Sequence, residues 1–361
     1  MELHRIDPAN LPCWRGPCRV ACRAGGVIAV RMPNWLGDAV MALPALRQLR
    51  CGGWRRIVAV APAPVSGLLE LTTAVDGVIV LPAAHCSWPG SAVDRLRAEG
   101  ADCGLLLTNS PRDVIYFRRA GVGRLYGSAA RGRSILMTAA YKFPHNHRGR
   151  TGILHHARKY SFLAEAVGGS GWDGEFPGYR LPESVIAAEL SGDPLLVLAP
   201  GAAYGAAKRW PSNSFANTAL RFLEDYRAGT VVIVGSKSES VICGEVADGI
   251  GHSDRVRNLC GRTALADLAA VLCRADYCIA NDSGIMHLSA SLGGAGLAVF
   301  GSTDYVSTAP LSSKWGVIYS AWGHCAPCFR RRCILSDEPL CMRAVNSGYV
   351  YNEMRKAIKE A

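Results

Sequence analysis

A carboxylate, Asp38, follows the first apolar segment of the sequence, within VIAVRMPNWLGDAV at 27–40. The apolar run predicts a buried strand and the next residues predict a helix, so Asp38 falls where that helix begins. In an α/β protein this turn often cradles a nucleotide phosphate, which a carboxylate would repel. No Lys or Arg lies within six residues of Asp38 on either side. Asp38 therefore either caps its own helix or acts as a general base on a substrate hydroxyl.

A second group of candidates follows strand-like segments in the second half of the chain. The turn AAYGAAKRWP at 202–211 holds Lys208, which suits a phosphate, although a lone Lys is also common in solvated loops. The turn NDSGIMH at 281–287 offers helix amides to a pyrophosphate, but its polar residues could also cap the helix or pack in the core. Glu239 could bind ribose hydroxyls or serve a helix dipole. The candidate ligand-binding residues are Gly201, Lys208, Arg209, Glu239, Asp282, Ser283, Gly284 and His287.

Four of the 14 cysteines form a C-x2-C-x4-C-x7-C string at Cys325, Cys328, Cys333 and Cys341. This spacing could hold a structural zinc through thiolates, and free or redox-labile thiols are the alternative. The first residues show no export signal, so we do not expect a disulfide framework. Most other cysteines should be small buried residues, since Cys103, Cys243, Cys260, Cys273 and Cys278 lie in or beside strand and helix patterns. Cys13, Cys18 and Cys22 lie in an N-terminal extension to which we assign no function.

Strand and helix patterns alternate along the chain, which predicts two α/β domains. Apolar runs at 27–32, 57–62, 77–82 and 103–108 read as strands, and a helix is expected over 151–168. A Gly- and Pro-rich linker follows. The later apolar runs are 194–201, 230–236, 256–261, 277–284 and 296–303. Because these runs are continuously apolar, each domain should contain a parallel sheet covered by helices on both faces. Ligands of such sheets bind beyond the carboxyl ends of the strands.

The net charge of +11 lies entirely in the first half of the chain. Residues 1–180 hold 23 Lys and Arg against 12 Asp and Glu, a difference of +11, and residues 181–361 hold 17 of each. Such a basic half suits a polyanion, either nucleic acid or an anionic lipid surface, although solubility alone is an alternative. No apolar run approaches the roughly 20 residues that span a bilayer, and the first residues do not form a signal peptide. We therefore expect a cytoplasmic protein.

Several of these motifs occur together, and in order, in one known family. The segments RMPNWLGDAVMALPALRQL, LAPGAAYGAAKRWP, IANDSGIMHLSASLG and CAPCFRRRCILSDEPLCM resemble the ADP-heptose:lipopolysaccharide heptosyltransferases of glycosyltransferase family 9. The resemblance spans roughly residues 27–345 and is strongest to the heptosyltransferase II branch. It implies a GT-B fold, in which two Rossmann-like domains with parallel sheets face each other across a cleft.

The resemblance also implies an organisation and a reaction. It divides the chain into an extension (1–26), an acceptor-binding domain (27–175), an ADP-sugar-binding domain (194–345) and a C-terminal helix (346–361). The reaction is the inverting transfer of heptose from ADP-heptose to the inner core of lipopolysaccharide, with no catalytic metal. Matching motifs make Asp38 the base and place Lys208 on the donor phosphates. They also place Glu239 and the turn of Asp282, Ser283, Gly284 and His287 around ADP.

The resemblance also implies a partner and a location, and other functions stay open beside it. The acceptor would be an anionic lipid A–Kdo molecule, bound by an enzyme peripheral to the inner face of the inner membrane, and no nucleic acid is expected. The stretches AAYGAA and LSDEPL depart from the family pattern, so a related GT-B transferase could use another nucleotide-sugar for core or O-antigen assembly. A nucleotide-sugar 2-epimerase shares this architecture. A non-enzymatic nucleotide- or nucleic-acid-binding protein is the alternative from a different class.

Overall fold

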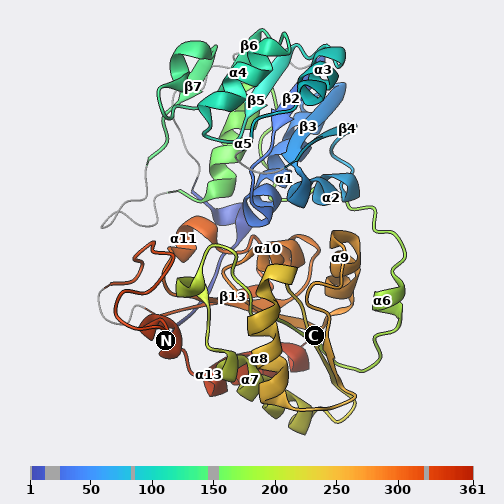
Figure 1. Ribbon diagram of the computed structural model, residues 1–361, viewed down its shortest axis with the longest axis vertical. Coiled ribbons are helices and arrows are strands. Elements are labelled where there is room, and N and C mark those ends of the chain that lie inside the picture. Colours follow the sequence, from blue (N-terminus) through green and yellow to red (C-terminus); the bar gives the residue numbers. More distant parts are fainter. Residues whose placement is uncertain (1, 13–24, 83–85, 145–153, 321–324, 361) are drawn as a thin grey trace. The chain divides into compact units, whose positions relative to one another are not determined.

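The computed structural model describes the chain except residues 1, 13–24, 83–85, 145–153, 321–324 and 361. It contains two compact units (Figure 1). The N-terminal unit contains Leu11–Asn146 and Ile153–Arg180, and the C-terminal unit contains Leu181–Ala361 together with Met1–Asn10. Among the described residues, no helix is both long enough and apolar enough to cross a membrane.

The N-terminal unit is built on a six-stranded sheet in the order β4-β3-β2-β5-β6-β7. All neighbouring strands are parallel, so their carboxyl ends lie along one edge. The strands are β2 (Val27–Arg31), β3 (Arg56–Pro62), β4 (Gly77–Leu81), β5 (Cys103–Leu106), β6 (Arg124–Ser128) and β7 (Ala139–Tyr141). The helices are α1 (Leu36–Cys51), α2 (Ala63–Leu71), α3 (Gly90–Ala98), α4 (Pro111–Arg119), η2 (Arg133–Leu136) and α5 (His156–Ala166).

The apolar runs of this unit become central strands because both faces of the sheet are covered. Ile28, Ala29 and Val30 of β2 are fully buried, as expected for strands that helices cover on both sides. The four strands expected before residue 110 are confirmed. The sequence did not predict β6 and β7, which are short and contain Gly, Ser and Ala rather than a run of β-branched residues. The long helix expected over 151–168 is found as α5.

The C-terminal unit contains a seven-stranded sheet in the order β1-β13-β12-β11-β8-β9-β10. The strands after β1 (Glu2–Arg5) are β8 (Leu195–Ala199), β9 (Thr230–Ile233), β10 (Val256–Asn258), β11 (Tyr277–Asn281), β12 (Gly296–Phe300) and β13 (Trp315–Tyr319). They are parallel except β1, which pairs antiparallel with β13 at the edge. The sequence did not predict that the first residues of the chain would join this sheet (Figure 1).

Helices cover the C-terminal sheet and form its core with the strands. They are α6 (Val185–Ala188), η3 (Ala206–Lys208), α7 (Ser212–Asp225), η4 (Lys237–Glu239), α8 (Ser240–Ile250), α9 (Leu265–Arg274), α10 (Gly284–Ser291), α11 (Tyr305–Thr308), α12 (Leu340–Arg343) and α13 (Ser347–Glu360). Trp210, Phe215 and Phe222 are buried beside strand residues such as Ile279 and Val299. This core fixes the turns after β8, β11 and β12, which hold most of the candidate residues.

Candidate active site

Asp38 lies in the first turn of α1, at the carboxyl end of β2. The N-cap residue of this helix is Trp35, and no side-chain hydrogen bond caps the helix there. The carboxylate is partly exposed, and its Oδ1 lies 3.5 Å from Nδ1 of His156. A carboxylate in a first turn also stabilises the helix dipole. The position therefore combines a favourable electrostatic environment with access to solvent at the strand tips.

Helix α5 brings three polar side chains close to Asp38. His156 is its first residue, and the preceding residue, His155, caps the helix by accepting the amide hydrogen of Ala157 at Nδ1. Burial lowers the pKa of Lys159, while the charge of Asp38 opposes this shift. Burial and the same charge raise the pKa of Tyr160. The sequence did not identify these neighbours, because only the packing of α5 on α1 brings them to Asp38.

A buried arginine holds the loop between β2 and α1. Arg31 is 3% exposed, and its Nε lies 3.2 Å from Oδ2 of Asp113 on α4. Its Nη1 donates to the carbonyl of Met32 at 2.5 Å, and its Nη2 donates to Oδ1 of Asn34 at 2.8 Å. Thr108 Oγ1 donates to the same Asp113 oxygen at 2.5 Å. This network fixes the residues immediately before Asp38.

The Asp113→Asn variant should be much less stable than the native protein, because it leaves the Arg31 guanidinium buried without its counter-charge. Breaking one partner of a buried ion pair costs about 3–5 kcal/mol. We expect a loss of free energy of unfolding of this size in urea denaturation. The control is Asp94→Asn, which removes the exposed pair between Asp94 and Arg97 and should cost below about 1 kcal/mol. Equal losses in the two variants would contradict the assignment.

In the C-terminal unit, three strand ends converge on one carboxylate. Lys208, after β8, places Nζ 2.5 Å from Oδ2 of Asp282, which follows β11. Thr303, after β12, donates to the same oxygen at 2.6 Å. The side chains of Lys208 and Asp282 are 13% and 6% exposed. Lys208 and Asp282, predicted from separate turns, are thus in direct contact.

Asn281 joins the turns that carry Lys208 and Asp282. It is fully buried at the end of β11. Its Oδ1 accepts the amide hydrogen of Trp210 at 2.9 Å, and its Nδ2 donates to the carbonyl of Pro200 at 2.7 Å. Both bonds reach the segment after β8, so they hold the Lys208 turn against the start of α10.

Unpaired polar atoms occur on residues next in the chain to Lys208, Asp282 and Thr303. Ser283 is the N-cap residue of α10 but makes no side-chain cap. Its Oγ, Nε of Arg209 and Oγ of Ser302 are buried and have no hydrogen-bond partner among the described residues. Buried polar atoms are nearly always paired, so these three are available to hydrogen-bond a polar ligand at the strand ends. Gly284 begins the helix, and His287 is buried within it.

Glu239 has a structural role at the next strand end. Its Oε2 accepts hydrogen bonds from the amide and the hydroxyl of Ser236, at 2.8 and 2.7 Å, in a capping box. Its Oε1 lies against Gly201, where an added Cβ would be only 2.1 Å from that oxygen. Gly201 therefore lets the carboxylate sit at the tip of β8. The expectation that Glu239 serves the start of its helix is confirmed, and the expectation that it binds ribose stays a prediction.

The cysteine-containing segment packs directly on the Lys208 turn. Tyr204 donates its hydroxyl hydrogen to the carbonyl of Phe329 at 3.0 Å, and the amide of Ala207 donates to the carbonyl of Arg331 at 3.1 Å. Both Lys208 and Arg331 place their charged groups over the Tyr204 ring, at 4.9 and 5.2 Å from its centroid. Sequence spacing gave no sign of this contact.

The four thiols of the string lie in different environments. Burial and the other three cysteines raise the pKa of Cys341 to about 11. Burial acts to raise the pKa of Cys333, but hydrogen bonds from the amides of Leu335, Ser336 and Leu340 lower it overall. Within the described residues, no three His, Cys, Asp or Glu side chains are arranged to hold a metal ion. Outside the string, Cys103, Cys243 and Cys278 are buried as expected, but Cys260 is only partly buried and Cys51, Cys86 and Cys273 are exposed, so the expectation that most of these cysteines are buried is wrong. Cys13, Cys18 and Cys22 lie outside the described residues.

The zinc hypothesis for this string predicts one zinc per chain in protein purified without chelator. Cys328→Ser should then lose the metal and lower the melting temperature, since structural zinc contributes directly to folding. Cys51→Ser, at an exposed cysteine of the N-terminal unit, is the matched control and should retain the metal. Elemental analysis and thermal unfolding give both readouts. Metal-free native protein would contradict the hypothesis and leave the alternative of free thiols.

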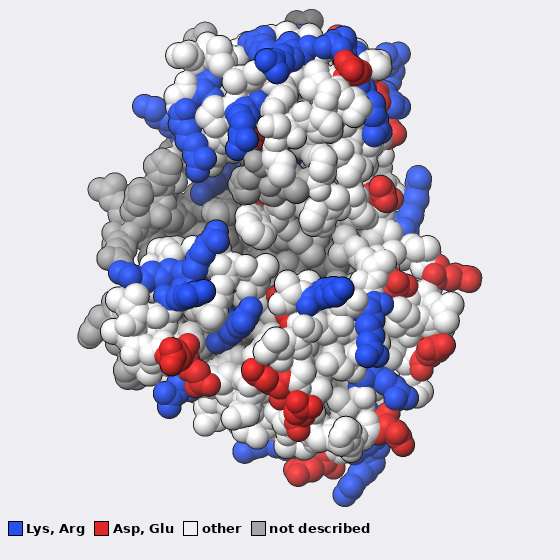
Figure 2. All heavy atoms as spheres, viewed as in Figure 1, with Lys and Arg blue, Asp and Glu red and all other residues white. Residues whose placement is uncertain are grey.

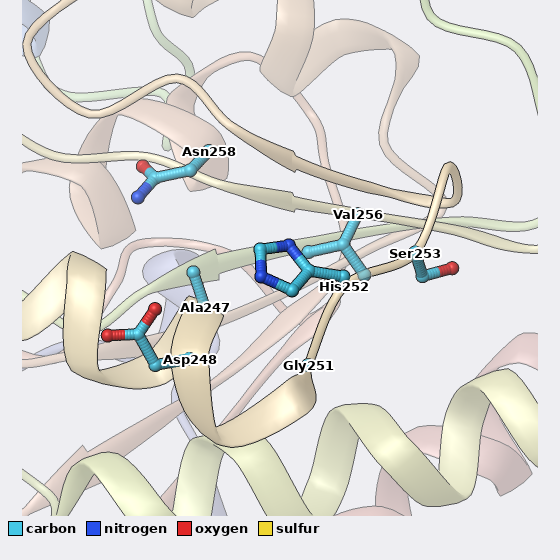
Figure 3. Close-up of a pocket in the computed structure, with 7 residues that line it drawn as sticks. All are labelled: Ala247, Asp248, Gly251, His252, Ser253, Val256 and Asn258. Carbon is cyan, nitrogen blue, oxygen red and sulfur yellow. The ribbon is translucent and has the colours of Figure 1, made fainter.

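A cavity of about 340 Å³ lies elsewhere in the C-terminal unit (Figure 3). Side chains from the end of α8, the following turn and β10 line it, and none of them is a candidate residue. Its lining residues include His252 and Ser253, both exposed, which precede β10. They lie at the amino end of that strand, opposite the edge where α/β proteins bind ligands. The cavity therefore does not coincide with the candidate site.

Known proteins resemble this chain over most of its length. It is 26% identical over 339 residues to lipooligosaccharide heptosyltransferase 2 of Campylobacter jejuni serotype O:6, covering 91% of this chain and 98% of the relative. It is 27% identical over 329 residues to lipopolysaccharide heptosyltransferase 2 of Salmonella typhimurium, covering 82% of this chain and 89% of the relative. Lipooligosaccharide heptosyltransferase 2 of C. jejuni serotype O:2 is 31% identical over 173 residues. That match covers 47% of this chain and 53% of the relative, so it spans about half the length of that relative.

Solved structures and a family model complete the comparison. Heptosyltransferase II of Escherichia coli aligns with a TM-score of 0.73 and 22% identity, over 92% of this chain and 99% of that one. A family 9 glycosyl transferase from Veillonella parvula aligns with a TM-score of 0.78 and 18% identity, over 95% of this chain and 100% of that one. The expected GT-B fold, with two Rossmann-like units, is confirmed. Since the model of glycosyltransferase family 9 (heptosyltransferase) matches residues 91–337, more than half of the chain, the protein belongs to this family and is a glycosyltransferase.

Proposed function

We propose that this protein transfers heptose from ADP-heptose to the inner core of lipopolysaccharide, with inversion at the anomeric carbon. The proposed acceptor is heptosyl-Kdo2-lipid A, an anionic lipid at the inner face of the inner membrane. The observation that carries the proposal is the separation of charge between the units. The carboxylate of Asp38 lies at the strand ends of the N-terminal unit. Lys208 lies at the strand ends of the C-terminal unit, where neighbouring residues have unpaired buried polar atoms.

The C-terminal unit would bind the donor. Lys208 and Arg209 supply positive charge, and the first amides of α10 point out from Ser283 and Gly284. A diphosphate at this edge would give partners to the buried Nε of Arg209 and to the hydroxyl groups of Ser283 and Ser302. Glu239 and His287 lie near the remaining parts of the donor in this proposal. Asp282 holds the ammonium group of Lys208 in place.

Asp38 would act on the acceptor. Its carboxylate takes the proton of the acceptor hydroxyl, whose oxygen then forms a bond to the anomeric carbon of heptose. The bond from this carbon to the β-phosphate oxygen breaks on the opposite side, and ADP leaves with the bonding electron pair. Inversion follows from this single displacement. Lys208 and the α10 amides stabilise the charge that develops on the diphosphate, which in enzymes is worth a few kcal/mol per fixed donor.

A donor panel tests the proposal and its main alternative. Purified protein is incubated with heptosyl-Kdo2-lipid A and, separately, ADP-heptose, ADP-glucose, UDP-glucose and UDP-N-acetylglucosamine, and release of the nucleoside diphosphate is measured. The proposal predicts turnover with ADP-heptose far above all others. Transfer from a UDP-sugar instead would indicate a related transferase of core or O-antigen assembly. In a separate incubation without acceptor, conversion of UDP-N-acetylglucosamine into its C2 epimer would indicate a 2-epimerase.

A further inference from the structure

The segment of residues 329–331, within the cysteine string, is bound through its backbone to two of the turns at the strand ends of the C-terminal unit. The amide of Phe329 donates to the carbonyl of Ser302, after β12, at 2.7 Å. The hydroxyl of Tyr204, after β8, donates to the carbonyl of Phe329 at 3.0 Å. The amide of Ala207, in the same turn, donates to the carbonyl of Arg331 at 3.1 Å. Bonds to two separate turns therefore fix this segment beside the candidate donor site.

The local backbone is adapted to this contact. Phe329 has a φ of 55°, in the left-handed region that a residue with a side chain adopts only at a cost in free energy. A Cβ on Gly205 would lie 2.3 Å from the carbonyl oxygen of Arg331, so only glycine lets the segment approach the turn this closely. Costly backbone conformations persist where the surrounding structure holds them, and they cluster at functional sites. The conformation therefore indicates that this contact does more than fill space.

The contact places the guanidinium group of Arg331 on the same aromatic ring as the ammonium group of Lys208. Arg331 Cζ lies 5.2 Å from the centroid of the Tyr204 ring, and Lys208 Nζ lies 4.9 Å from it. The face of an aromatic ring attracts a cation at such distances. The ring therefore brings two like charges together, and a bound anion would relieve their mutual repulsion.

The side chain of Arg331 is available to a ligand. It is exposed, and within the described part of the chain no Asp or Glu pairs with its guanidinium group. Lys208, by contrast, is 13% exposed and already pairs with Asp282. Figure 2 shows Lys and Arg side chains gathered over the segment that leads to α12, the red loop at the left of the C-terminal unit in Figure 1. Arg330, Arg331 and Arg332 are consecutive in this segment and all three are exposed.

The acidic and basic residues that the sequence predicts for the donor site balance each other. The positive charges of Lys208 and Arg209 are offset by the negative charges of Glu239 and Asp282. Asp304, which follows β12 and caps α11, adds a buried carboxylate. Each phosphate of a sugar nucleotide brings a further negative charge. A site of this composition therefore needs another cation to hold a diphosphate.

We propose that Arg331 binds the diphosphate of the donor together with Lys208, and that Tyr204 is the positioning residue that holds both cations. A planar guanidinium group forms paired hydrogen bonds with phosphate oxygens, whereas an ammonium group acts as a point charge. The cysteine string thus supplies a ligand to the site in addition to its structural contacts. The inference rests on the proposed function for the presence of a nucleoside diphosphate at these strand ends.

Isothermal titration of the full chain with ADP tests the inference without acceptor or turnover. Arg331→Gln should bind ADP about tenfold more weakly, the usual effect of losing a hydrogen bond to a charged group. The same variant should keep the native melting temperature and bind adenosine, which has no phosphate, like the native protein. Arg331→Lys keeps the charge but loses the planar pair of donors, so its affinity for ADP should lie between those of Arg331→Gln and the native protein.

Two neighbouring arginines are the matched controls. Arg330→Gln and Arg332→Gln each remove one exposed charge from the same segment. At physiological ionic strength salt screens exposed charges that do not touch the ligand, so both variants should bind ADP within about twofold of the native affinity.

Two variants of Tyr204 test its positioning role. Tyr204→Phe keeps the ring and loses only the hydroxyl bond to Phe329, so it should bind ADP within about twofold of the native affinity. Tyr204→Leu removes the ring and should bind ADP about fivefold more weakly, the value of a cation held on an aromatic face. Its affinity for adenosine should be native, whereas a merely structural role would change ADP and adenosine binding together.

The outcomes separate this inference from the proposed function. Native ADP affinity in a folded Arg331→Gln variant would overturn the inference and leave the proposed function intact. Equal losses in all three arginine variants would also overturn it, because they would show general attraction by surface charge instead of a specific contact. ADP binding that depends on Arg331 in a protein that transfers no heptose would uphold the inference and contradict the proposed function. Absence of ADP binding by the native protein would contradict both.

Discussion

The Asp38→Asn variant is expected to lower kcat by about 10²–10⁴-fold, the usual contribution of a general base. Asn has nearly the same shape as Asp but cannot accept the acceptor proton. Binding of ADP should be unchanged, because the proposed donor residues lie on the other unit. Steady-state kinetics with ADP-heptose and isothermal titration with ADP separate the two effects.

A matched control shows that the loss is specific to this carboxylate. Asp94→Asn alters an exposed acid on α3 of the same unit and should retain native kcat. His156→Gln removes the imidazole next to Asp38 and should reduce kcat less than Asp38→Asn, since the carboxylate itself remains. Full turnover by Asp38→Asn would rule out the proposed base and leave Asp38 as a residue that serves its helix.

The Lys208→Met variant is expected to bind ADP-heptose about ten- to a hundredfold more weakly and to turn over more slowly. A hydrogen bond to a charged group contributes about 1.5–3 kcal/mol, and Lys208 is the cation proposed for the diphosphate. The substitution also leaves Asp282, which is 6% exposed, without its ammonium partner. The melting temperature therefore has to be measured beside the affinity.

Two further variants separate binding from folding. Lys208→Arg keeps the charge next to Asp282 and should recover most of the stability and part of the donor affinity. Lys314→Met removes an exposed lysine of the same unit, whose Nζ donates to the carbonyl of Gly293, and should bind ADP-heptose normally. Native donor affinity in a folded Lys208→Met variant would contradict the role assigned to Lys208.

The sequence predicted the parts of the site that depend on parallel sheets. Because parallel strands end along one edge, residues after separate apolar runs could be expected to meet, and Lys208 and Asp282 do so. The main strands were also predictable, because a strand that is buried on both faces has a continuously apolar sequence. The same reasoning could not find β6 and β7, whose residues do not form such runs.

What the sequence could not predict depends on contacts between distant segments. His156 and Lys159 reach Asp38 only because α5 packs on α1, and neither residue has a local pattern that marks this contact. The docking of the Phe329–Arg331 segment on the Lys208 turn rests on carbonyl groups, which every residue has. The buried pair of Arg31 and Asp113 was missed because charged residues are usually read as surface positions.

The most direct test of the proposed reaction is the intact mass of the acceptor after a single incubation with ADP-heptose. The native protein should add one heptose to heptosyl-Kdo2-lipid A and release one ADP for each acceptor modified. The Asp38→Asn variant should leave the acceptor mass unchanged over the same time while still binding ADP. An unmodified acceptor with the native protein, or an equal mass gain with Asp38→Asn, would contradict the proposed transfer or the proposed base, respectively.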